Sequence, residues 1–294
     1  MSSDRNVSYE EKCRRLHGLM SKYTSRDVAV AFSGGADSAL LLKMAVVHGT
    51  ENGSSVVAIT ADTKLHPAGD EAVARRVAEE TGAEHRVLKI CELDLAQIAE
   101  NPVDRCYHCK KFLFEAIRKE AEKVKAAEVL EGTNTDDLKQ YRPGLRAVAE
   151  LGIRSPLKEA GLTKEDVRKL AKEYGISVAN RPSAPCLATR FPYGDGLTGE
   201  KLRKVEQGEN YLKNLGLYNV RLRVHRDIAR IEIDLCDMGT FLDRREEVVR
   251  NLKELGYRYV TLDLEGFRSG SMDEALLEAG GIENGGDGKY GERK

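Results

Sequence analysis

The chain lacks a long apolar segment, a secretory signal and a large net charge. No stretch approaches the ~20 consecutive apolar residues of a transmembrane helix, so we expect no membrane-spanning segment. The opening residues have no apolar core of a secretory signal, and we therefore expect a cytoplasmic protein. The formal net charge is only -1, which gives the surface as a whole no attraction to nucleic acid and disfavours a tRNA partner.

The composition describes a globular protein of moderate size. Its 294 residues, 41% hydrophobic and 32% charged, are enough for one large or two ordinary domains with their own cores. In a reducing compartment the cysteines should be thiols, metal ligands or catalytic groups rather than disulfides. Two of them, Cys91 and Cys236, lie at strand ends and are expected in the core. The full set is Cys13, Cys91, Cys106, Cys109, Cys186 and Cys236.

Short β-rich runs alternate with helical patterns in the first part of the chain. Apolar strands that alternate with helices predict a parallel sheet covered on both faces, so the expected fold class is α/β with a doubly wound parallel sheet. Ligands of such sheets bind beyond the carboxyl ends of the strands, where the motifs below fall or can reach. We expect strands at residues 28–32, 55–60, 85–90 and 128–130, and helices at 8–23, 38–47 and 68–81.

The pattern changes after about residue 190, where a smaller α+β unit is predicted. We divide the chain into a larger domain at 1–185, a smaller domain at 186–272 and a Gly-rich tail at 273–294 that we expect to be disordered. The smaller unit is expected to have helices at 197–215 and 241–255 and strands at 220–224, 229–235 and 259–264.

A glycine-rich turn, SGGADS, stands between the first strand and the helix that follows it. Backbone N–H groups and the helix dipole converge on such a turn and favour a bound anion, although small residues there could also serve packing alone. No lysine follows the glycines, so this is not the G-x-x-x-x-G-K-[ST] loop. The turn resembles the pyrophosphate loop, or PP-loop, of N-type ATP pyrophosphatases, which implies ATP as cosubstrate. The residues assigned to ATP are Ser33, Gly34, Gly35, Asp37 and Ser38.

The GTNTDD loop after the fourth strand is rich in oxygen atoms that could bind a metal. Carboxylates at a strand end suit Mg²⁺ beside phosphate oxygens, although Asp and Asn are also common as local helix caps. Because this loop should lie at the same sheet edge as the glycine turn, we assign Mg²⁺ to Asp37 and Asp136. Further ATP contacts are assigned to Gly132 and Thr133, and Thr60 at the end of the second strand is expected to line the adenosine.

Two arginines follow this loop. Forked guanidinium groups match the geometry of carboxylates and phosphates, so Arg142 and Arg146 are candidates to hold an acidic substrate or ATP. A solvated helix face would explain the same two residues equally well.

Three of the cysteines have a spacing that can carry chemistry. Cys106 and Cys109 form a C-x-x-C at a predicted helix start, and Cys186 lies in a segment whose prolines keep it out of a helix. Three thiolates can hold three corners of a [4Fe–4S] cluster and leave one iron open. A structural zinc site would need a fourth protein ligand, which His108 could supply, and buried inert thiols are a third interpretation. The residue types alone leave these possibilities open.

Together, these segments resemble the LarE-type sulfur transferases. The resemblance runs in order from about residue 10 to residue 272. It implies an adenine nucleotide alpha hydrolase-like PP-loop domain, followed by a smaller domain for catalysis and subunit contacts. Besides the glycine turn, the matching stretches are RCYHCKK (105–111), GTNTDD (132–137), YRPGLRA (141–147), CLATRFPYG (186–194) and LDLEGFRSGS (262–271).

The resemblance also implies a reaction, which belongs to the synthesis of the nickel-pincer nucleotide cofactor of lactate racemase. ATP adenylates a carboxylate of pyridinium-3,5-biscarboxylic acid mononucleotide, and sulfur then replaces oxygen, with AMP as the leaving group. Some members of the family sacrifice the sulfur of the cysteine that matches Cys186. Others hold a [4Fe–4S] cluster with a labile sulfide on three cysteines, and this chain resembles them because Cys106, Cys109 and Cys186 are all present.

Further expectations come from the same resemblance. The smaller domain should bind phosphate, and we assign Arg221 to this role; Glu209, Arg223 and Arg230 lie in the corresponding region. The implied partners are the small pyridinium mononucleotide, a sulfide donor and other copies of the chain in a homo-oligomer.

Three alternatives stay open at this point. Cys186 alone could give up its sulfur, with the cysteine pair as a bystander. The chain could be a PP-loop tRNA thiolase, which would require a basic surface and salt-sensitive tRNA binding. It could also be a non-catalytic nucleotide or iron–sulfur binding module, which turnover of ATP to AMP and pyrophosphate would exclude.

Overall fold

The computed structural model describes residues 7–139, 142–182, 185–268 and 270–272 of the chain. The tail that we expect to be disordered, residues 273–294, lies outside the described residues, as do Tyr141 and Ser269 of the matching stretches.

A parallel sheet forms the centre of the larger unit, and this confirms the predicted α/β class. Its strands are β1 (Val28–Ala31), β2 (Val56–Thr63), β3 (Glu84–Ile90) and β4 (Glu128–Leu130), in the order β3-β2-β1-β4. Val28 pairs in register with Val56 on one side and Glu128 on the other. Because these strands run in the same direction, the loops after β1, β2 and β4 all leave from one edge of the sheet.

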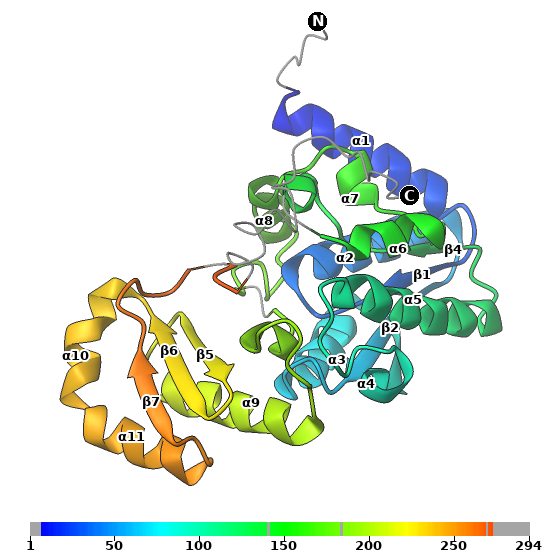
Figure 1. Cartoon of the computed structure of the whole chain (residues 1–294). Helices are drawn as coiled ribbons and strands as arrows, with labels where there is room; N and C mark the ends of the chain where they lie inside the picture. The colour runs from blue at the N-terminus through cyan, green and yellow to red at the C-terminus, as the bar shows by residue number, and fades with distance from the viewer. Residues whose placement is uncertain (1–6, 140–141, 183–184, 269, 273–294) are drawn as a thin grey trace, which may run out of the picture.

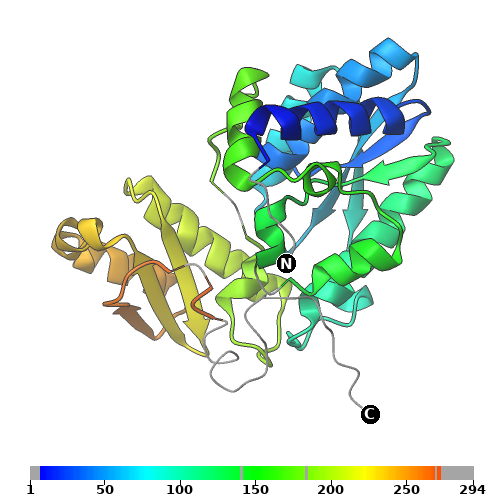
Figure 2. The same ribbon diagram turned by 90° about the horizontal axis from the view of Figure 1, so that it is seen from above.

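Helices cover both faces of this sheet, as Figures 1 and 2 show. They are α1 (Tyr9–Tyr23), α2 (Ala36–Asn52), α3 (Gly69–Thr81), α5 (Arg105–Lys123), α6 (Gly144–Glu150) and α8 (Lys164–Glu173). Val28 and Val30 of β1 pack with α1, α2, α3 and α8, whereas Ala29 packs with α5 and α6. Side chains alternate between the faces of a strand, and burial on both faces explains why β1 is apolar throughout.

Short elements connect these layers. Local signals fix some of their ends: α8 begins with a capping box in which Thr163 and Asp166 exchange side-chain to backbone hydrogen bonds. The connecting elements are α4 (Glu92–Leu95), α7 (Pro156–Glu159) and the 3-10 turns η1 (Thr135–Lys139), η2 (Leu187–Arg190) and η3 (Leu235–Asp237).

A second, smaller sheet belongs to the C-terminal unit. Its strands are β5 (Val220–His225), β6 (Ile228–Ile233) and β7 (Tyr259–Leu262), and its helices are α9 (Gly199–Asn214), α10 (Met238–Asp243) and α11 (Arg245–Glu254). β5 and β6 form an antiparallel hairpin, and β7 pairs with β6 in parallel. The core of this unit also includes Leu65, Leu93 and Ile98 from the larger unit. The domain boundary between residues 185 and 186 therefore stays a prediction.

The single helix predicted at residues 241–255 is two helices in the structure. The chain leaves helical geometry at Arg244, with φ -101° and ψ 11°, so α10 and α11 are separate. Phe241 and Val248 are nevertheless both buried, at a spacing of about two helical turns. The apolar periodicity thus continues across the break and could not reveal it. Within the described ranges, no helix combines the length and the apolar character needed to cross a membrane.

Candidate functional site

The glycine turn joins the carboxyl end of β1 to the N-terminus of α2. Gly34 has a φ of +71°, and a Cβ at this position would lie 2.9 Å from the Cα of Ala74 on α3. Glycine is favoured here because it adopts this conformation without cost and leaves room for the neighbouring backbone. Part of the glycine requirement is therefore structural, since α3 packs directly against the turn.

Two serine hydroxyls face each other inside the turn. The Oγ atoms of Ser33 and Ser38 lie 3.1 Å apart, and Ser38 Oγ donates to the Gly35 carbonyl at 3.1 Å. Gly35 caps α2 through its backbone alone, since glycine has no side chain to accept from the first N–H groups of the helix. These N–H groups, together with the helix dipole, form a site suited to a phosphate.

The loop after β4 packs against the start of α2. A Cβ on Gly132 would lie 3.0 Å from the backbone N of Ser38, so glycine permits this close approach. Behind the loop, buried Glu131 accepts hydrogen bonds from the Thr133 N–H at 3.2 Å, from the Thr133 hydroxyl at 2.7 Å and from the Ser155 hydroxyl. The Thr133 side chain is thus tied to the protein interior, and its contact with ATP stays a prediction.

A lysine that the sequence did not predict stands beside both loops. Lys164, the first residue of α8, contacts Asp37 Oδ2 through Nζ, and its backbone N–H donates to Asp136 Oδ2 at 2.8 Å. Lys139 also pairs with Asp136, at 2.6 Å. Because Lys164 lies 127 residues after Asp37, no local pattern could have revealed the contact.

The two carboxylates suit a divalent cation in their chemistry. The side chains of Asp37 and Asp136 are partly exposed, and Mg²⁺ prefers carboxylates that it can share with phosphate oxygens and water. The hydrogen bonds from the Lys139 ammonium and the Lys164 N–H hold the pKa of Asp136 below its usual range, so this carboxyl is ionised at neutral pH. These residues therefore fit Mg²⁺.

Thr60 lies at the sheet edge but is engaged within the protein. Its side chain is buried, and its hydroxyl donates to the Phe32 carbonyl at 2.7 Å and lies 2.8 Å from His85 Nε2. Thr60 thus links β2 to the residue before the glycine turn, and its contact with adenosine stays a prediction.

The two arginines after the GTNTDD loop both have partners on the protein. Arg142 forms an ion pair with Asp137 at 3.0 Å. Arg146, on α6, stacks its guanidinium 3.6 Å from the centre of the Tyr107 ring and lies 3.5 Å from Glu150. Since Tyr107 belongs to the C-x-x-C segment, Arg146 stands close to the start of α5.

The folded chain brings the three cysteines into one neighbourhood. Cys106 and Cys109 lie at the start of α5, as predicted, and Cys186 directly precedes η2. All three are free thiols, with Cys106 exposed and the other two half-buried. Burial raises the pKa of the Cys109 thiol, and the nearby Cys186 raises it further. Burial also raises the pKa of Cys186, to which Cys106 adds.

Arg105 lies among these sulfurs. Its Nη2 is 3.8 Å from Cys106 Sγ, and its Nη1 donates to the buried side chain of Asn101. Burial alone would lower the pKa of Arg105, but the sulfurs of Cys186 and Cys106 raise it. A buried guanidinium in this place supplies the positive charge that thiolates require.

Arg181 and Leu187, on either side of Cys186 in the sequence, contact two parts of the larger unit. Arg181 points Nη1 toward the Gly34 carbonyl at 3.5 Å. Just after Cys186, the Leu187 N–H donates to the Leu65 carbonyl at 2.8 Å, in the loop that follows β2. Arg181 thus contacts the predicted ATP site, and Leu187, next to Cys186, contacts the loop after β2.

The three thiols are the candidate ligands of the predicted metal centre. Across the described ranges, no group of three or more His, Cys, Asp or Glu side chains converges to hold one ion. His108, the possible zinc ligand, is hydrogen-bonded to Asp104 at 3.0 Å. A [4Fe–4S] cluster is held by several thiolates placed around it, and three thiols beside a guanidinium fit that donor set.

The prediction that two other cysteines lie in the core is wrong. Cys91 and Cys236, expected in the core because they follow strands, are both exposed. Cys91 lies at the N-cap of the short helix α4, and Cys236 lies in η3. The chain turns away from each sheet at these points, so the buried pattern of the strand does not continue.

Buried charges lie against the smaller sheet. Arg190 donates two hydrogen bonds to Glu209, at 2.7 and 2.9 Å, and Arg223 pairs with the buried Glu232 at 3.0 Å. Burial and the nearby Arg190 lower the pKa of Arg221 to about 10. Arg221 donates to the Val220 carbonyl at 2.8 Å, and its guanidinium lies 5.1 Å from the centre of the Phe267 ring.

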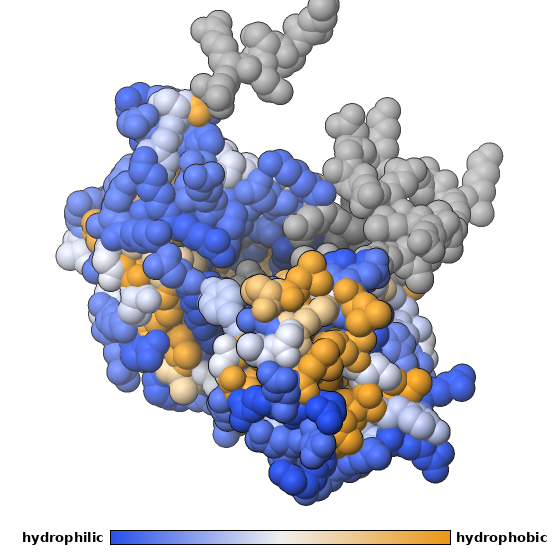
Figure 3. Space-filling view, turned by 90° about the vertical axis from the view of Figure 1, so that its left-hand side faces the viewer, coloured by the Kyte–Doolittle hydropathy of each residue, from blue (hydrophilic) through white to orange (hydrophobic). Residues whose placement is uncertain are grey.

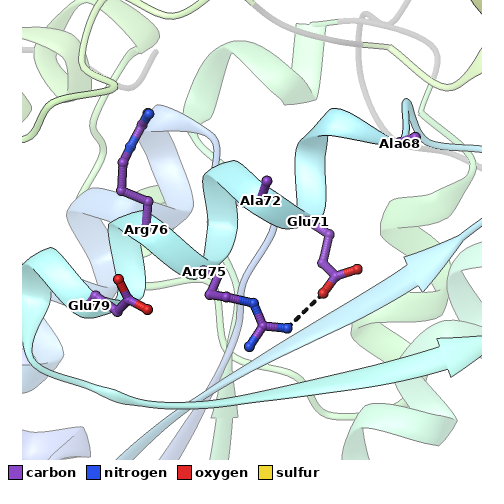
Figure 4. A pocket seen from close by; sticks show the side chains of 6 residues that line it. All are labelled: Ala68, Glu71, Ala72, Arg75, Arg76 and Glu79. Atoms are coloured by element: carbon purple, nitrogen blue, oxygen red, sulfur yellow. Dashed lines mark hydrogen bonds and ion pairs between the residues drawn. The ribbon is translucent and has the colours of Figure 1, made fainter.

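Two hollows mark the surface of the larger unit. The first lies along α3, where Figure 4 shows Arg75 paired with Glu71, and its lining contains no described residue assigned to the site. The second adjoins Asp136 and continues along α8. It is lined by Asp136, Lys164, Glu165, Arg168, Lys169, Lys172 and Glu173.

Comparison with known proteins identifies relatives over most of the chain. A model of the PP-loop domain family matches residues 8–139. The pyridinium-3,5-bisthiocarboxylic acid mononucleotide synthase of Lactiplantibacillus plantarum is 43% identical over 253 residues, which cover 86% of this chain and 91% of that protein.

Two uncharacterized proteins are also similar. One, from Synechocystis, is 37% identical over 267 residues, 90% of this chain and 98% of its own length. The other, from Methanocaldococcus jannaschii, is 34% identical over 253 residues, 86% of this chain and 95% of its own length. As its motifs predict, the chain belongs to the PP-loop family of the pyridinium-3,5-bisthiocarboxylic acid mononucleotide synthase.

Proposed function

We propose that the chain is an ATP-dependent sulfur transferase that converts pyridinium-3,5-biscarboxylic acid mononucleotide to a thiocarboxylate. The observation that carries this proposal is that Cys186 lies near Cys109, while Arg181, shortly before it in the sequence, contacts the glycine turn. The name of the L. plantarum relative, at 43% identity, gives a bisthiocarboxylic acid mononucleotide as its product and supports sulfur transfer to such a mononucleotide. One connected site would activate a carboxylate and supply sulfur to it.

The first step makes the carboxylate reactive. A carboxylate oxygen of the substrate bonds to the α-phosphorus of ATP, and pyrophosphate leaves with the electron pair of the broken P–O bond. The N–H groups at the start of α2 and the hydroxyls of Ser33 and Ser38 would hold the pyrophosphate. Mg²⁺ bound by Asp37 and Asp136 would neutralise charge on the phosphate oxygens.

The second step replaces oxygen by sulfur. A hydrosulfide ion bonds to the acyl carbon of the adenylate, AMP leaves with the bridging oxygen, and the thioacid releases its proton to water. Cys106, Cys109 and Cys186 would hold a [4Fe–4S] cluster, which supplies a labile sulfide when it is bound. Arg105 would stabilise the thiolates, and a cluster held close to the ATP site would shorten the path of the sulfur.

The substrate phosphate would bind at the smaller sheet. Arg221 stands beside Arg190 and Arg223, and its lowered pKa reflects burial and the repulsion between these guanidinium groups. A phosphate dianion would relieve that repulsion. The substrate would then lie between its phosphate at this sheet and its carboxylate at the glycine turn.

Anaerobic reconstitution with iron and sulfide tests the proposal. We expect a brown protein whose visible absorbance is lost in each of Cys106→Ser, Cys109→Ser and Cys186→Ser. Cys91 and Cys236 are also exposed but are not assigned to the cluster, so Cys91→Ser and Cys236→Ser are matched controls that should keep both the colour and the activity. Activity is measured as AMP, pyrophosphate and thiocarboxylate formed from ATP and the pyridinium mononucleotide.

Other outcomes would favour the alternatives. A colourless protein after reconstitution would count against the cluster, and the mass loss of one H₂S at Cys186 after turnover would indicate sacrificial transfer. Salt-sensitive tRNA binding would favour a tRNA thiolase. Failure to turn over ATP in the presence of the substrate would leave a binding module.

We also propose that the chain forms a homo-oligomer through its smaller unit. Figure 3 shows apolar side chains gathered on one face of this unit. Among the exposed large apolar residues of the unit, Leu264, Leu235 and Leu242 are 81%, 65% and 50% exposed. Such patches are typical of interaction surfaces. Sedimentation of the wild type and Leu264→Glu tests this, and a wild-type monomer at all concentrations would contradict it. The cytoplasmic location stays a prediction.

A further inference from the structure

Lys164 joins the two carboxylates of the proposed metal site from a distant part of the chain. Its Nζ contacts Asp37 Oδ2, and its backbone N–H donates to Asp136 Oδ2 at 2.8 Å. The side chains of Lys164 and Asp37 are 28% and 25% exposed, so the pair borders solvent and a ligand can reach it. Asp136 and Lys164 also line the hollow that continues along α8.

The backbone of Lys164 is held firmly while its side chain can move. The capping box of Thr163 and Asp166 fixes the first turn of α8, and Val167 in that turn is buried in the core. A lysine side chain has a flexible four-carbon stem. The ammonium can therefore change its partner without a change in the fold.

Lys164 also supplies a charge that the glycine turn lacks. Loops of the G-x-x-x-x-G-K-[ST] type place a lysine on the phosphates directly after the glycines, and SGGADS has none. Asp37 lies in the first turn of α2, beside the N–H groups suited to phosphate, so Lys164 stands within the same site.

A divalent cation and the ammonium would compete for Asp37. Two positive charges at one carboxylate repel each other, so the arrival of a metal ion with ATP would drive the ammonium away from Asp37. The oxygens of the pyrophosphate group would offer it negative charge close by. Without nucleotide, the Lys164 ammonium would pair with Asp37. With nucleotide, the metal ion would pair with Asp37 and the ammonium with the pyrophosphate oxygens.

We propose that Lys164 is a mobile cation of the pyrophosphate site. It neutralises Asp37 while no nucleotide is bound, and it moves its ammonium onto the pyrophosphate oxygens when a divalent cation takes Asp37. This role rests on the proposed function only in that ATP is cleaved to AMP and pyrophosphate here. Lys164 thus keeps bare metal ions off the site and binds the leaving group of the first step.

The first test measures binding of Mn²⁺ alone, from the electron paramagnetic resonance signal of the free ion. Lys164→Met removes the charge and keeps a long side chain, and Lys172→Met makes the same change further along α8. We expect Lys164→Met to bind Mn²⁺ roughly tenfold more tightly than the wild type, a difference of about 1.4 kcal/mol, because no ammonium competes. Lys172→Met should bind like the wild type. Equal affinity in Lys164→Met and the wild type would overturn the proposal.

The second test measures binding of inorganic pyrophosphate at saturating Mn²⁺ by calorimetry. We expect roughly tenfold weaker binding in Lys164→Met and near wild-type binding in Lys164→Arg, which keeps the charge. Pyrophosphate affinity that is unchanged in Lys164→Met would refute the transfer of the ammonium. If circular dichroism shows that Lys164→Met is unfolded, Lys164→Gln replaces it in both tests with the same expected directions.

Both tests are independent of the sulfur chemistry. They use neither the thiols nor the pyridinium substrate. If both give the expected result and sulfur transfer fails, the proposed function is wrong while the role of Lys164 stands. If sulfur transfer succeeds and either test fails, only the role of Lys164 is refuted.

Discussion

Glu209 allows the clearest test of the charges buried in the smaller unit. Its carboxylate accepts hydrogen bonds from Arg190 at 2.7 and 2.9 Å and from the Leu222 N–H at 3.1 Å. The Arg190 and Glu209 side chains are only 3% and 2% exposed. Water therefore has almost no access to replace a partner that is removed.

The substitution Glu209→Gln removes the charge and keeps the shape of the side chain. The new amide N–H₂ group would face an N–H donor of Arg190, and the buried guanidinium would lose its counterion. Removing one partner of a buried ion pair costs about 3–5 kcal/mol in the free energy of unfolding. With an unfolding entropy of ~2.1 cal/mol/K per residue over 294 residues, this lowers the melting temperature by roughly 5–8 °C.

Urea unfolding followed by circular dichroism, together with calorimetry, measures the change. The double variant Arg190→Met, Glu209→Leu is the control, because it removes both charges and leaves no unpaired ion. We expect it to be more stable than Glu209→Gln alone, since apolar replacements of buried pairs are often tolerated. If Glu209→Gln loses less than about 1 kcal/mol, the pair behaves like a solvent-exposed one and the reasoning is refuted.

Three further predictions concern the pH response and the two loops of the site. Burial would raise the pKa of Glu209, but the hydrogen bonds of its arginine partner hold it below the ordinary value of 4.5. This carboxylate stabilises the fold above its unfolded pKa and loses that effect as the pH falls, so below about pH 4.5 urea titrations should show a steeper loss in the wild type than in Glu209→Gln. Gly34→Ala should cost about 1–3 kcal/mol, because it needs a φ of +71° and its Cβ would meet the α3 backbone at 2.9 Å. In Gly35→Ala the new Cβ would make an ordinary contact with Ser33 Oγ at 3.5 Å, so this variant should have a melting temperature near that of the wild type. Equal melting temperatures for Gly34→Ala and Gly35→Ala would contradict this. Glu131→Leu leaves the Thr133 N–H and hydroxyl without their acceptor and should weaken ATP binding in calorimetry, whereas unchanged affinity would show that the loop holds its shape unaided.

The fold of the larger unit could be predicted from local patterns. A strand buried on both faces must be apolar throughout, and the consecutive residues Val28, Ala29 and Val30 are all apolar and buried. The glycine turn and the C-x-x-C at the start of α5 could also be predicted, because each depends on a few neighbouring residues. The same local reasoning failed for Cys91 and Cys236, where the chain leaves a sheet and the strand pattern no longer applies.

The partners of the charged side chains could not be predicted in this way. Lys164 meets Asp37 across 127 residues, and Glu209 meets Arg190 across 19. Periodicity indicates which face of an element is buried, but it says nothing about which charge on another element lies opposite. Arg105 likewise stands among the thiols only because α5 and the segment around Cys186 pack together.

The amino-acid sequence by itself determined the parallel sheet, the glycine turn and the family, because these depend on short patterns that adjacent residues carry. Only the tertiary structure decided that Lys164 would join the two carboxylates and that Arg105 would lie beside the thiols. The physical reason is that an ion pair forms wherever packing places two charges within reach, and packing is a property of the whole chain.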